Sequence, residues 1–250
     1  MKFKEILNNA EHRPWPLPSG KWMYYQEWND VVFLHWRVDH EELRKLVPKD
    51  LQIEKYNGES WVSLVAFTME KVRLRNLPSF PSVSNFHEIN FRTYVKFKGK
   101  QGVYFLSMEC GSKISCLVAK VLSGLPYRYS RIIRNKGLCS SVNVKSKDKL
   151  YLKYEVGNQL THKSGIDKWL TERYALFQDK DKAINEFNIH HVEWPLNKIK
   201  VSDLRLDYPK FNGLLNHSPE ITHYSPGVKV IAWDKERNKK LGSAVFSENV

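Results

Sequence analysis

One strand-like stretch carries the residues of this chain that are best suited to chemistry. Between residues 86 and 97, every second position is polar or ionisable: Glu88, Asn90, Arg92 and Tyr94. Because successive side chains of a β-strand point to opposite faces, these four share one face and the other face is apolar. A carboxylate can accept a proton, and a guanidinium binds carboxylates or carbonyl oxygens through charge-assisted hydrogen bonds. The pattern predicts a strand with one apolar face and one chemical face.

The elements that follow this strand deliver a second set of candidate residues. A glycine-containing turn over residues 98–101 and an apolar run over 102–108 predict the return strand of a hairpin. Apolar residues at helical spacing predict a helix over 113–123, which ends at Gly124 as a glycine cap. Tyr127 and Arg128 therefore follow just past the end of that helix.

Six segments of the chain, in this order, resemble one known family. They are His-Arg-Pro-Trp-Pro-Leu-Pro (12–18), His-Trp-Arg-Val-Asp (35–39), Glu-Ile-Asn-Phe-Arg-Thr-Tyr-Val (88–95), Gly-Leu-Pro-Tyr (124–127), Leu-Thr-Glu-Arg-Tyr (170–174) and His-His-Val-Glu-Trp-Pro-Leu (190–196). They resemble the YqjF-like family, domain of unknown function 2071. That family is a branch of the acetoacetate decarboxylase-like superfamily, whose central motif is Gly-aromatic-Pro-Lys-Lys.

The resemblance implies a fold. It is an α+β, mostly β, acetoacetate decarboxylase-like β-barrel with a few peripheral helices and an interior small-molecule cavity. The length of 250 residues and the hydrophobic content of 42% are compatible with one such domain over residues 1–250. Residues 1–20 are expected to form an extended N-terminal arm, because its prolines exclude the preceding residues from the helical region. Trp15 is expected to pack the arm on the body, and the alternative is that the arm covers a cavity mouth or a neighbouring subunit.

The chain departs from the decarboxylase motif at one position. In the superfamily, the first lysine after the proline forms a Schiff base with a keto acid. The corresponding residue here is Tyr127, and a phenol cannot form an imine. Lys120, about two helical turns earlier, is an alternative amine only if the helix points it into the cavity. Glu88 matches the buried carboxylate of the family, so the resemblance implies a retained cavity without Schiff-base decarboxylation.

These observations lead to one hypothesis for the site. We expect the cavity to bind a small organic carboxylate or carbonyl compound, and the sequence leaves open whether a reaction follows. Glu88 is expected to act as a buried base or hydrogen-bond acceptor with a raised pKa, and Tyr127 is expected to donate a hydrogen bond or a proton. The expected substrate-binding residues are Arg92, Asn90, His35 and Arg128. The alternative is a satisfied polar cluster, because Glu88 and Arg92 lie about 13 Å apart along the strand and need cross-strand partners.

Composition limits the other classes of function. The net charge is +13, from 40 Lys and Arg against 27 Asp and Glu, so a basic nucleic-acid-binding or anionic-surface-binding protein is the alternative function. The basic residues mostly alternate or occupy turns, and we therefore expect no specific nucleic acid partner. Three cysteines without Cys-x-x-Cys spacing predict a reduced, cytoplasmic protein. The sequence shows neither a membrane span nor a signal peptide, and it leaves open whether the chain forms a homo-oligomer.

No cofactor or metal ion is expected. His191 and Glu193 share a strand face and could supply two metal ligands, but no third ligand stands at a convincing spacing.

The remaining pattern predicts short strands and turns. Residues 73–86 are expected to form a long loop, typical of a lid or a binding loop, with Leu77, Phe80 and Val83 on its apolar underside. Strands are expected over 22–28, 31–38, 51–56, 61–72 and 187–196, with a meander over 129–133, 138–144 and 150–156, a helix beginning at 165, a polar connection to 215 and a closing hairpin over 221–233.

Overall fold

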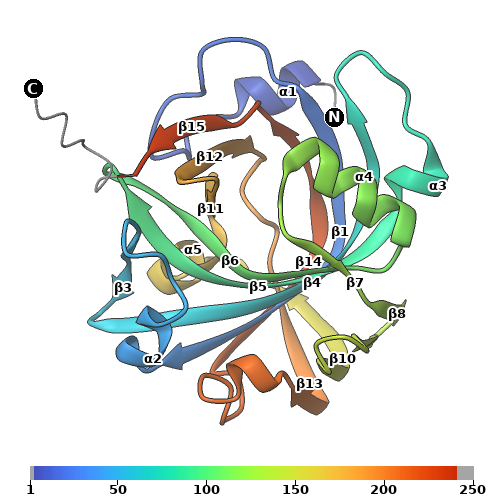
Figure 1. Ribbon diagram of the computed structural model, residues 1–250. Helices are drawn as coiled ribbons and strands as arrows, with labels where there is room; N and C mark the ends of the chain where they lie inside the picture. Colours follow the sequence, from blue (N-terminus) through green and yellow to red (C-terminus); the bar gives the residue numbers. More distant parts are fainter. Residues whose placement is uncertain (1–2, 241–250) are drawn as a thin grey trace, which may run out of the picture.

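The computed structural model describes residues 3–240 of the predicted 1–250 domain, and β-strands dominate it (Figure 1). The elements in chain order are α1 (Phe3–Asn8), β1 (Tyr24–Val38), α2 (His40–Arg44), β2 (Gln52–Ile53), β3 (Lys55–Tyr56), β4 (Glu59–Leu74), α3 (Pro81–Ser84), β5 (Phe86–Phe97), β6 (Lys100–Cys110), α4 (Lys113–Ser123), β7 (Tyr127–Tyr129), β8 (Arg131–Asn135), β9 (Leu138–Val142), β10 (Lys149–Gln159), α5 (Gly165–Thr171), β11 (Ala175–Lys180), β12 (Ala183–His190), β13 (Asn197–Asp207), a 3-10 turn (Pro209–Phe211), β14 (Ile221–Ala232) and β15 (Glu236–Lys239).

Seven strands form a ring. Their order is β12, β11, β6, β5, β4, β1 and β14, and β12 then pairs with β14. The ring has two thin seams. At the first, β6 and β11 run parallel and share two residue pairs; at the second, Ile189 and His190 of β12 pair with Ala232 and Ile231 of β14. The expected barrel is therefore a ring of strands closed by short contacts.

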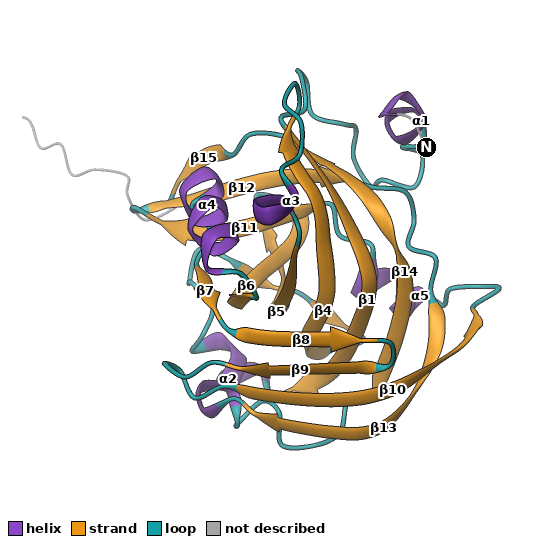
Figure 2. Cartoon of the chain, turned by 90° about the vertical axis from the view of Figure 1, so that its right-hand side faces the viewer, coloured by secondary structure: helices purple, strands orange, loops and turns teal. Residues whose placement is uncertain are grey.

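A second layer covers the outer face of β1, β4 and β5. Strands β13, β10, β9 and β8 continue the sheet beyond β14 and wrap around the ring (Figure 2). Between the layers lies an apolar core that includes Leu34, Leu64, Phe91, Leu152 and Phe211, all buried. The predicted meander is confirmed as β8, β9 and β10, which pair as antiparallel neighbours. Strand β5 is consequently buried on both faces, and its polar face points into the ring.

The N-terminal arm packs on the outside of the ring near the β12–β14 seam. Arg13 donates hydrogen bonds to the carbonyl of Ile189 at 2.6 Å and to His190 Nδ1 at 3.3 Å. The ring of His190 contacts the Ile6 carbonyl through Nε2 at 2.8 Å. Trp15 packs against the core, as expected. Among the described residues of the arm, none lines the interior pockets, and the contacts above attach the arm to the seam.

Four local expectations were wrong. Residues 221–232 form the single strand β14 and not a hairpin, because this segment pairs with β1 in one continuous register. Gly227 adopts φ 128° opposite Asn29, where a Cβ would lie 2.2 Å from the Trp28 carbonyl oxygen. The expected polar connection contains β13, whose exposed residues masked the strand pattern. Residues 191–196 leave the strand, since Pro195 cannot donate to a ladder. Leu77 and Phe80 do not form a buried underside and are exposed.

Candidate functional site

Strand β5 places three predicted site residues on the inside of the ring. Glu88, Asn90 and Arg92 are all buried, and they lie opposite Phe67, Val65 and Ser63 of β4. Two residues of β5 advance the chain by about 6.6 Å, so the three side chains form a row along the cavity wall. The alternation predicted from the sequence is what brings them together.

Helix α4 positions Tyr127. Ser112 caps the start of the helix by accepting a hydrogen bond from the Ser115 amide, and Gly124 ends it in the left-handed region at φ 72°. The chain then enters β7, in which Tyr127 pairs in parallel with Met108 of β6. The phenol donates a hydrogen bond of 2.9 Å to Glu88 Oε2. Tyr127, which follows the helix cap, thus contacts the carboxylate of Glu88, which lies 39 positions earlier in the chain.

The row of polar residues lines an inner cavity of about 80 Å³. Its other walls are largely apolar and come from five further strands and the segments around Leu125 and Trp194. An outer pocket of about 120 Å³ lies beside it, beneath α4, and is lined mainly by apolar side chains. The two spaces share the lining residues Gln26, Met69, Leu125, Tyr127, Leu176 and Ile189. The arrangement is a chamber with one polar wall, which shares part of its lining with an apolar outer pocket.

Burial sets the protonation of Glu88. Removal from water raises the pKa of its carboxyl to about 7, and hydrogen bonds from Asn90 (3.2 Å) and Tyr127 oppose that rise. Burial also raises the pKa of Tyr127 well above its usual value, with a further rise from the neighbouring carboxylate. Glu88 therefore holds and releases a proton near neutral pH, while Tyr127 remains a hydrogen-bond donor.

Arg92 is a buried cation without a counter-ion. Among the described residues, none of the carboxylates forms an ion pair with it, and its Nη2 atom reaches the Leu170 carbonyl at 3.4 Å. Its Nε atom is buried without a hydrogen-bond partner, and so is Oδ1 of Asn90. Burial lowers the pKa of Arg92, because the charged form loses its hydration. Two residues that line the same cavity thus keep unused polar atoms.

His35 lies behind the cavity and not in its wall. Its Nδ1 atom contacts Ser63 Oγ at 2.6 Å, and Ser63 in turn contacts the hydroxyl of Tyr94. Tyr94 donates to the Leu170 carbonyl at 3.0 Å, the same carbonyl that Arg92 reaches. The expected substrate-binding residue His35 therefore lies outside the lining of the inner cavity, and its contacts support the Arg92 end of the chamber.

The same network extends to residues that the sequence analysis missed. His223 Nδ1 lies 3.4 Å from His35 Nε2, and His223 Nε2 lies 3.0 Å from Asp167 Oδ1. The sequence signal at Asp167 was a helix cap, since Ser164 and Asp167 form a capping box at the start of α5. The other carboxylate oxygen of Asp167, Oδ1, contacts His223, and no local sequence pattern indicates this contact.

Arg128 points away from the cavity. It donates to Asp148 Oδ2 at 2.9 Å and lies 4.0 Å from Glu109, on the outer side of β7. Neighbours in a strand face opposite sides, so Tyr127 and Arg128 cannot both enter the ring. Lys120 is exposed on the outer side of α4, and within residues 3–240 the lining of the inner cavity includes no lysine.

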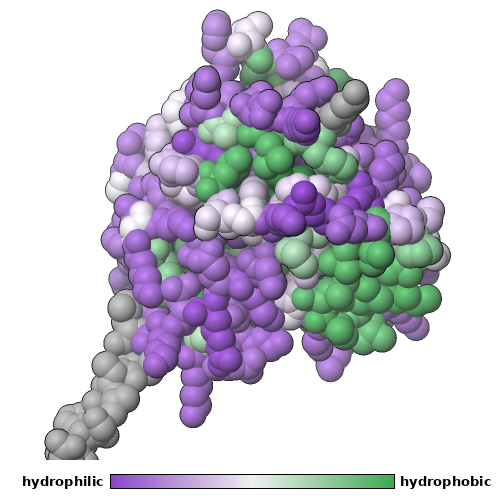
Figure 3. Space-filling model, turned by 90° about the horizontal axis from the view of Figure 1, so that it is seen from above, coloured by the Kyte–Doolittle hydropathy of each residue, from purple (hydrophilic) through white to green (hydrophobic). Residues whose placement is uncertain are grey.

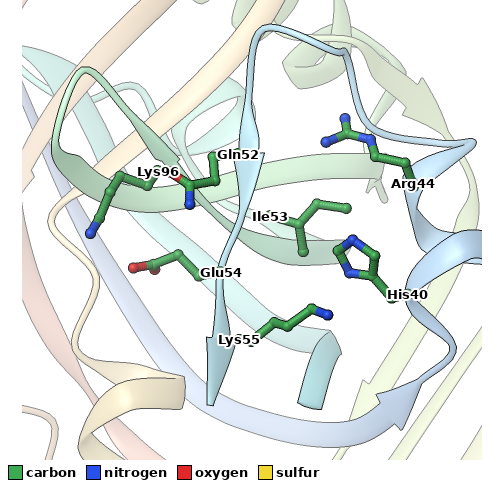
Figure 4. Close-up of a pocket in the computed structure, with 7 residues that line it drawn as sticks. All are labelled: His40, Arg44, Gln52, Ile53, Glu54, Lys55 and Lys96. Carbon is green, nitrogen blue, oxygen red and sulfur yellow. The ribbon is translucent and has the colours of Figure 1, made fainter. Parts of the chain in front are cut away.

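A larger depression lies outside the ring, beside α2 and β2. It measures about 520 Å³ and is lined by His40, Arg44, Gln52, Ile53, Glu54, Lys55 and Lys96 (Figure 4). The side-chain ends of Arg44, Lys55 and Lys96 point in different directions. Arg44 donates to the carbonyls of Val47, Pro48 and Leu51, so its guanidinium serves the local loop. This open depression lacks the convergent polar groups of the chamber inside the ring.

Neither a metal cluster nor a membrane-spanning helix is found in the described chain. No group of three or more His, Cys, Asp and Glu side chains is placed to hold a metal ion between residues 3 and 240. His191 Nδ1 contacts the Val192 carbonyl at 2.7 Å, while Glu193 faces Lys163 and Lys168. Over the same residues, none of the helices has the length and apolar character needed to cross a bilayer.

The ring, the interior chamber and the helix beneath which it opens define a protein with the acetoacetate decarboxylase-like fold. A solved acetoacetate decarboxylase superposes with a TM-score of 0.62 at 17% identity, over 97% of this chain and 100% of that one. The enduracididine biosynthesis enzyme MppR, in its complex with pyruvate, gives a TM-score of 0.58 at 10% identity, over 91% and 94% of the two chains. At these identities the likeness concerns the fold.

The sequence comparison is more specific. Residues 25–229 match the model of the DUF2071 family, described as an uncharacterized conserved protein, and the chain belongs to this family. It is 33% identical over 225 residues to the uncharacterized protein YqjF of Bacillus subtilis (strain 168), covering 87% of this chain and 93% of the relative. The resemblance inferred from the six segments is thereby confirmed.

Proposed function

We propose that the protein binds a small organic carboxylate or carbonyl compound inside the ring, with the polar end of the ligand at Arg92 and Asn90. The observation that carries this proposal is the buried guanidinium of Arg92, which has no carboxylate partner among the described residues. An unpaired buried charge is costly, and an anion or a carbonyl oxygen would satisfy it. The unused Oδ1 atom of Asn90 would accept a hydrogen bond from a hydroxyl or an acid proton on the ligand.

The chamber would also support proton transfer. With a pKa of about 7, the carboxylate of Glu88 would take a proton from the carbon beside a ligand carbonyl. The electron pair of that C–H bond would move onto the carbonyl oxygen, where Arg92 would stabilise the negative charge. The proton then returns to carbon from Glu88. Tyr127 would hold the carboxylate in place through its hydrogen bond.

Schiff-base chemistry is not part of the proposal. The residue after Pro126 is a tyrosine, and the lysine nearest in sequence, Lys120, is exposed. Lys235 lines the outer pocket and is the amine to examine if an imine is detected. The MppR neighbour holds pyruvate, which makes pyruvate a reasonable first probe of a keto-acid site on the same fold.

Ligand binding can be tested by thermal shift against a panel of small carboxylates and ketones that includes pyruvate. At least one compound should raise the melting temperature of the wild type, and Glu88→Gln or Tyr127→Phe should abolish the shift. Proton transfer can be tested by NMR, as exchange of the methyl protons of pyruvate for deuterium. Borohydride treatment with pyruvate should leave all lysines unmodified. The proposal is wrong if no compound stabilises the wild type, and labelling of a lysine overturns the exclusion of the imine.

A further inference from the structure

Helix α4 exposes its apolar side to solvent. Ile114, Leu117, Val121 and Leu122 are 61%, 65%, 73% and 47% exposed. The buried residues of the helix are Ser115 and Cys116, which are small. A helix on the surface of a globular domain normally turns its apolar residues inward. The orientation of α4 is the reverse, so its outer side is suited to contact an apolar environment.

A second segment extends this surface. Helix α3 packs against α4 and lies beside it in Figure 2. The loop that leads into α3 exposes Leu77 and Phe80, which are 52% and 62% accessible. We call the six exposed residues Leu77, Phe80, Ile114, Leu117, Val121 and Leu122 the apolar face. In Figure 3 a broad hydrophobic area lies at the lower right, over α4. Contiguous apolar surface of this kind marks an interaction site.

The charges around the apolar face are predominantly positive, although the exposed Asp234 lines the outer pocket together with Leu122. Residues 71–87 and 110–147, which contain all six apolar residues, include no Asp or Glu. On α4 itself, Lys113 and Lys120 are exposed along one edge of the apolar side. At the C-terminal end of the helix, the amines of Lys180 and Lys235 lie near Gly124. The apolar face is therefore bordered by cations within these segments.

An apolar face bordered by lysines fits some binding partners better than others. A second copy of the chain docked through the same face would bring the lysines of both copies together, and like charges oppose such an interface. A nucleic acid would complement the lysines but has no use for exposed Leu, Ile, Val and Phe side chains. An anionic bilayer surface accommodates both features, because aliphatic and aromatic side chains enter the interface while lysines contact the lipid headgroups.

We propose that the apolar face of α4 and the loop before α3 docks the protein on an anionic membrane surface. The outer pocket supports the same orientation, because Ala119, Leu122 and Ser123 of α4 line it. Docking through α4 would hold the mouth of this apolar pocket at the bilayer interface. The proposal does not depend on the identity of the ligand or on any reaction in the chamber.

The test is co-sedimentation of the full chain with vesicles. The probes are vesicles of phosphatidylcholine alone and vesicles in which about one third of the lipid is phosphatidylglycerol. We expect binding to the anionic vesicles that is at least about tenfold tighter than to the neutral ones and that weakens with salt. Val121→Asp should reduce it at least about tenfold, and Lys113→Gln with Lys120→Gln should reduce it about fivefold per lysine.

Val144→Asp is the matched control. Val144 is 88% exposed in the turn after β9, so the substitution makes the same change of residue and charge at an exposed site outside the apolar face. It should bind vesicles nearly as well as the wild type, and circular dichroism should show that all variants are folded. Equal sedimentation of the wild type with and without anionic vesicles overturns the proposal. So does a dimer, detected by light scattering, that Val121→Asp dissociates, or an RNA mobility shift that Val121→Asp leaves unchanged while vesicle binding is absent.

Discussion

The hydroxyl of Tyr127 donates a hydrogen bond of 2.9 Å to the buried carboxylate of Glu88. The carboxylate sits on a central strand of the ring, and the phenol is delivered by the helix cap that precedes it. The hydrogen bond from the phenol lowers the pKa of Glu88 because it favours the ionised carboxylate, whereas burial raises that pKa because it favours the neutral acid. Burial is the larger effect, and its consequence can be measured in the pH dependence of stability.

Glu88 should make the protein less stable as the pH rises from about 4.5 to about 7. Its folded-state pKa of about 7 exceeds the value of 4.5 expected in the unfolded chain, so the folded state retains a proton that the unfolded state releases. The stabilising contribution is complete below about pH 4.5 and is lost by about pH 7, a change of about 3 kcal/mol. Denaturant unfolding of Glu88→Gln should lack this slope. Tyr127→Phe should shift the carboxyl titration, followed by infrared spectroscopy, to higher pH.

An exposed glutamate provides the control for that measurement. Glu59, at the exposed start of β4, should give the wild-type slope when replaced by Gln. If Glu88→Gln and Glu59→Gln show the same pH dependence, Glu88 is ionised throughout this range and cannot be the base that we propose.

Replacing Arg92 by Met should separate ligand binding from folding. The substitution removes a buried cation that lacks an ion-pair partner among the described residues, so the free energy of unfolding should stay equal or rise. Binding of a stabilising carboxylate should weaken by about 2 kcal/mol or more, because its counter-ion is lost. Calorimetric titration measures the second effect. Arg128→Met, which removes the partner of Asp148 outside the ring, should lower stability by about 1–3 kcal/mol and leave binding unchanged.

The sequence predicted the core of the site because that core depends on local geometry. Alternation along β5 places Glu88, Asn90 and Arg92 on one face wherever the strand lies, and the glycine cap fixes where Tyr127 begins its strand. The same rule shows that Arg128 must diverge from Tyr127. The separation of Glu88 and Arg92 along the strand did not prevent a shared chamber, since the cavity extends along the strand.

What the sequence could not predict depends on contacts between distant segments. His223 contacts His35 and Asp167, which lie 188 and 56 positions away from it in the chain. Each of these residues fits its own segment without the contact, so no local sequence pattern indicates it. Strand β13 of the outer layer was also not predicted, because it alternates between exposed and half-buried positions and lacks a fully apolar face. That layer is the reason why both faces of β5 are buried.

His191 should make the protein sensitive to acid. Burial lowers its pKa to about 4, although the nearby Glu172 opposes the shift, while the unfolded value is 6.5. The folded state binds this proton less readily than the unfolded state, so the contribution is complete above pH 6.5 and is lost as the pH falls toward 4, by about 3 kcal/mol. Because Glu88 changes stability in the opposite direction over a similar range, the effect of His191 is read as a difference from the wild type: the free energy of unfolding of His191→Gln should rise relative to that of the wild type, by about 3 kcal/mol, as the pH falls from 6.5 to 4. His162→Gln, at an exposed position, should follow the wild-type curve; equally steep curves for both variants would assign the acid sensitivity elsewhere.

The apolar outer pocket should make affinity depend on the length of the ligand. If a carboxylate occupies the Arg92 end of the chamber, each added methylene extends along Leu125 and Leu176 toward α4. Burial of a methylene contributes about 0.8 kcal/mol, so affinity should rise about fourfold per carbon in a series of straight-chain 2-keto acids until the outer pocket is filled. Calorimetric titration gives the slope. Ala119→Leu, which narrows the outer pocket from α4, should end the rise at a shorter chain, whereas Val121→Leu on the exposed side of the same helix should leave it unchanged. A flat series in the wild type would mean that ligands do not extend beyond the inner cavity.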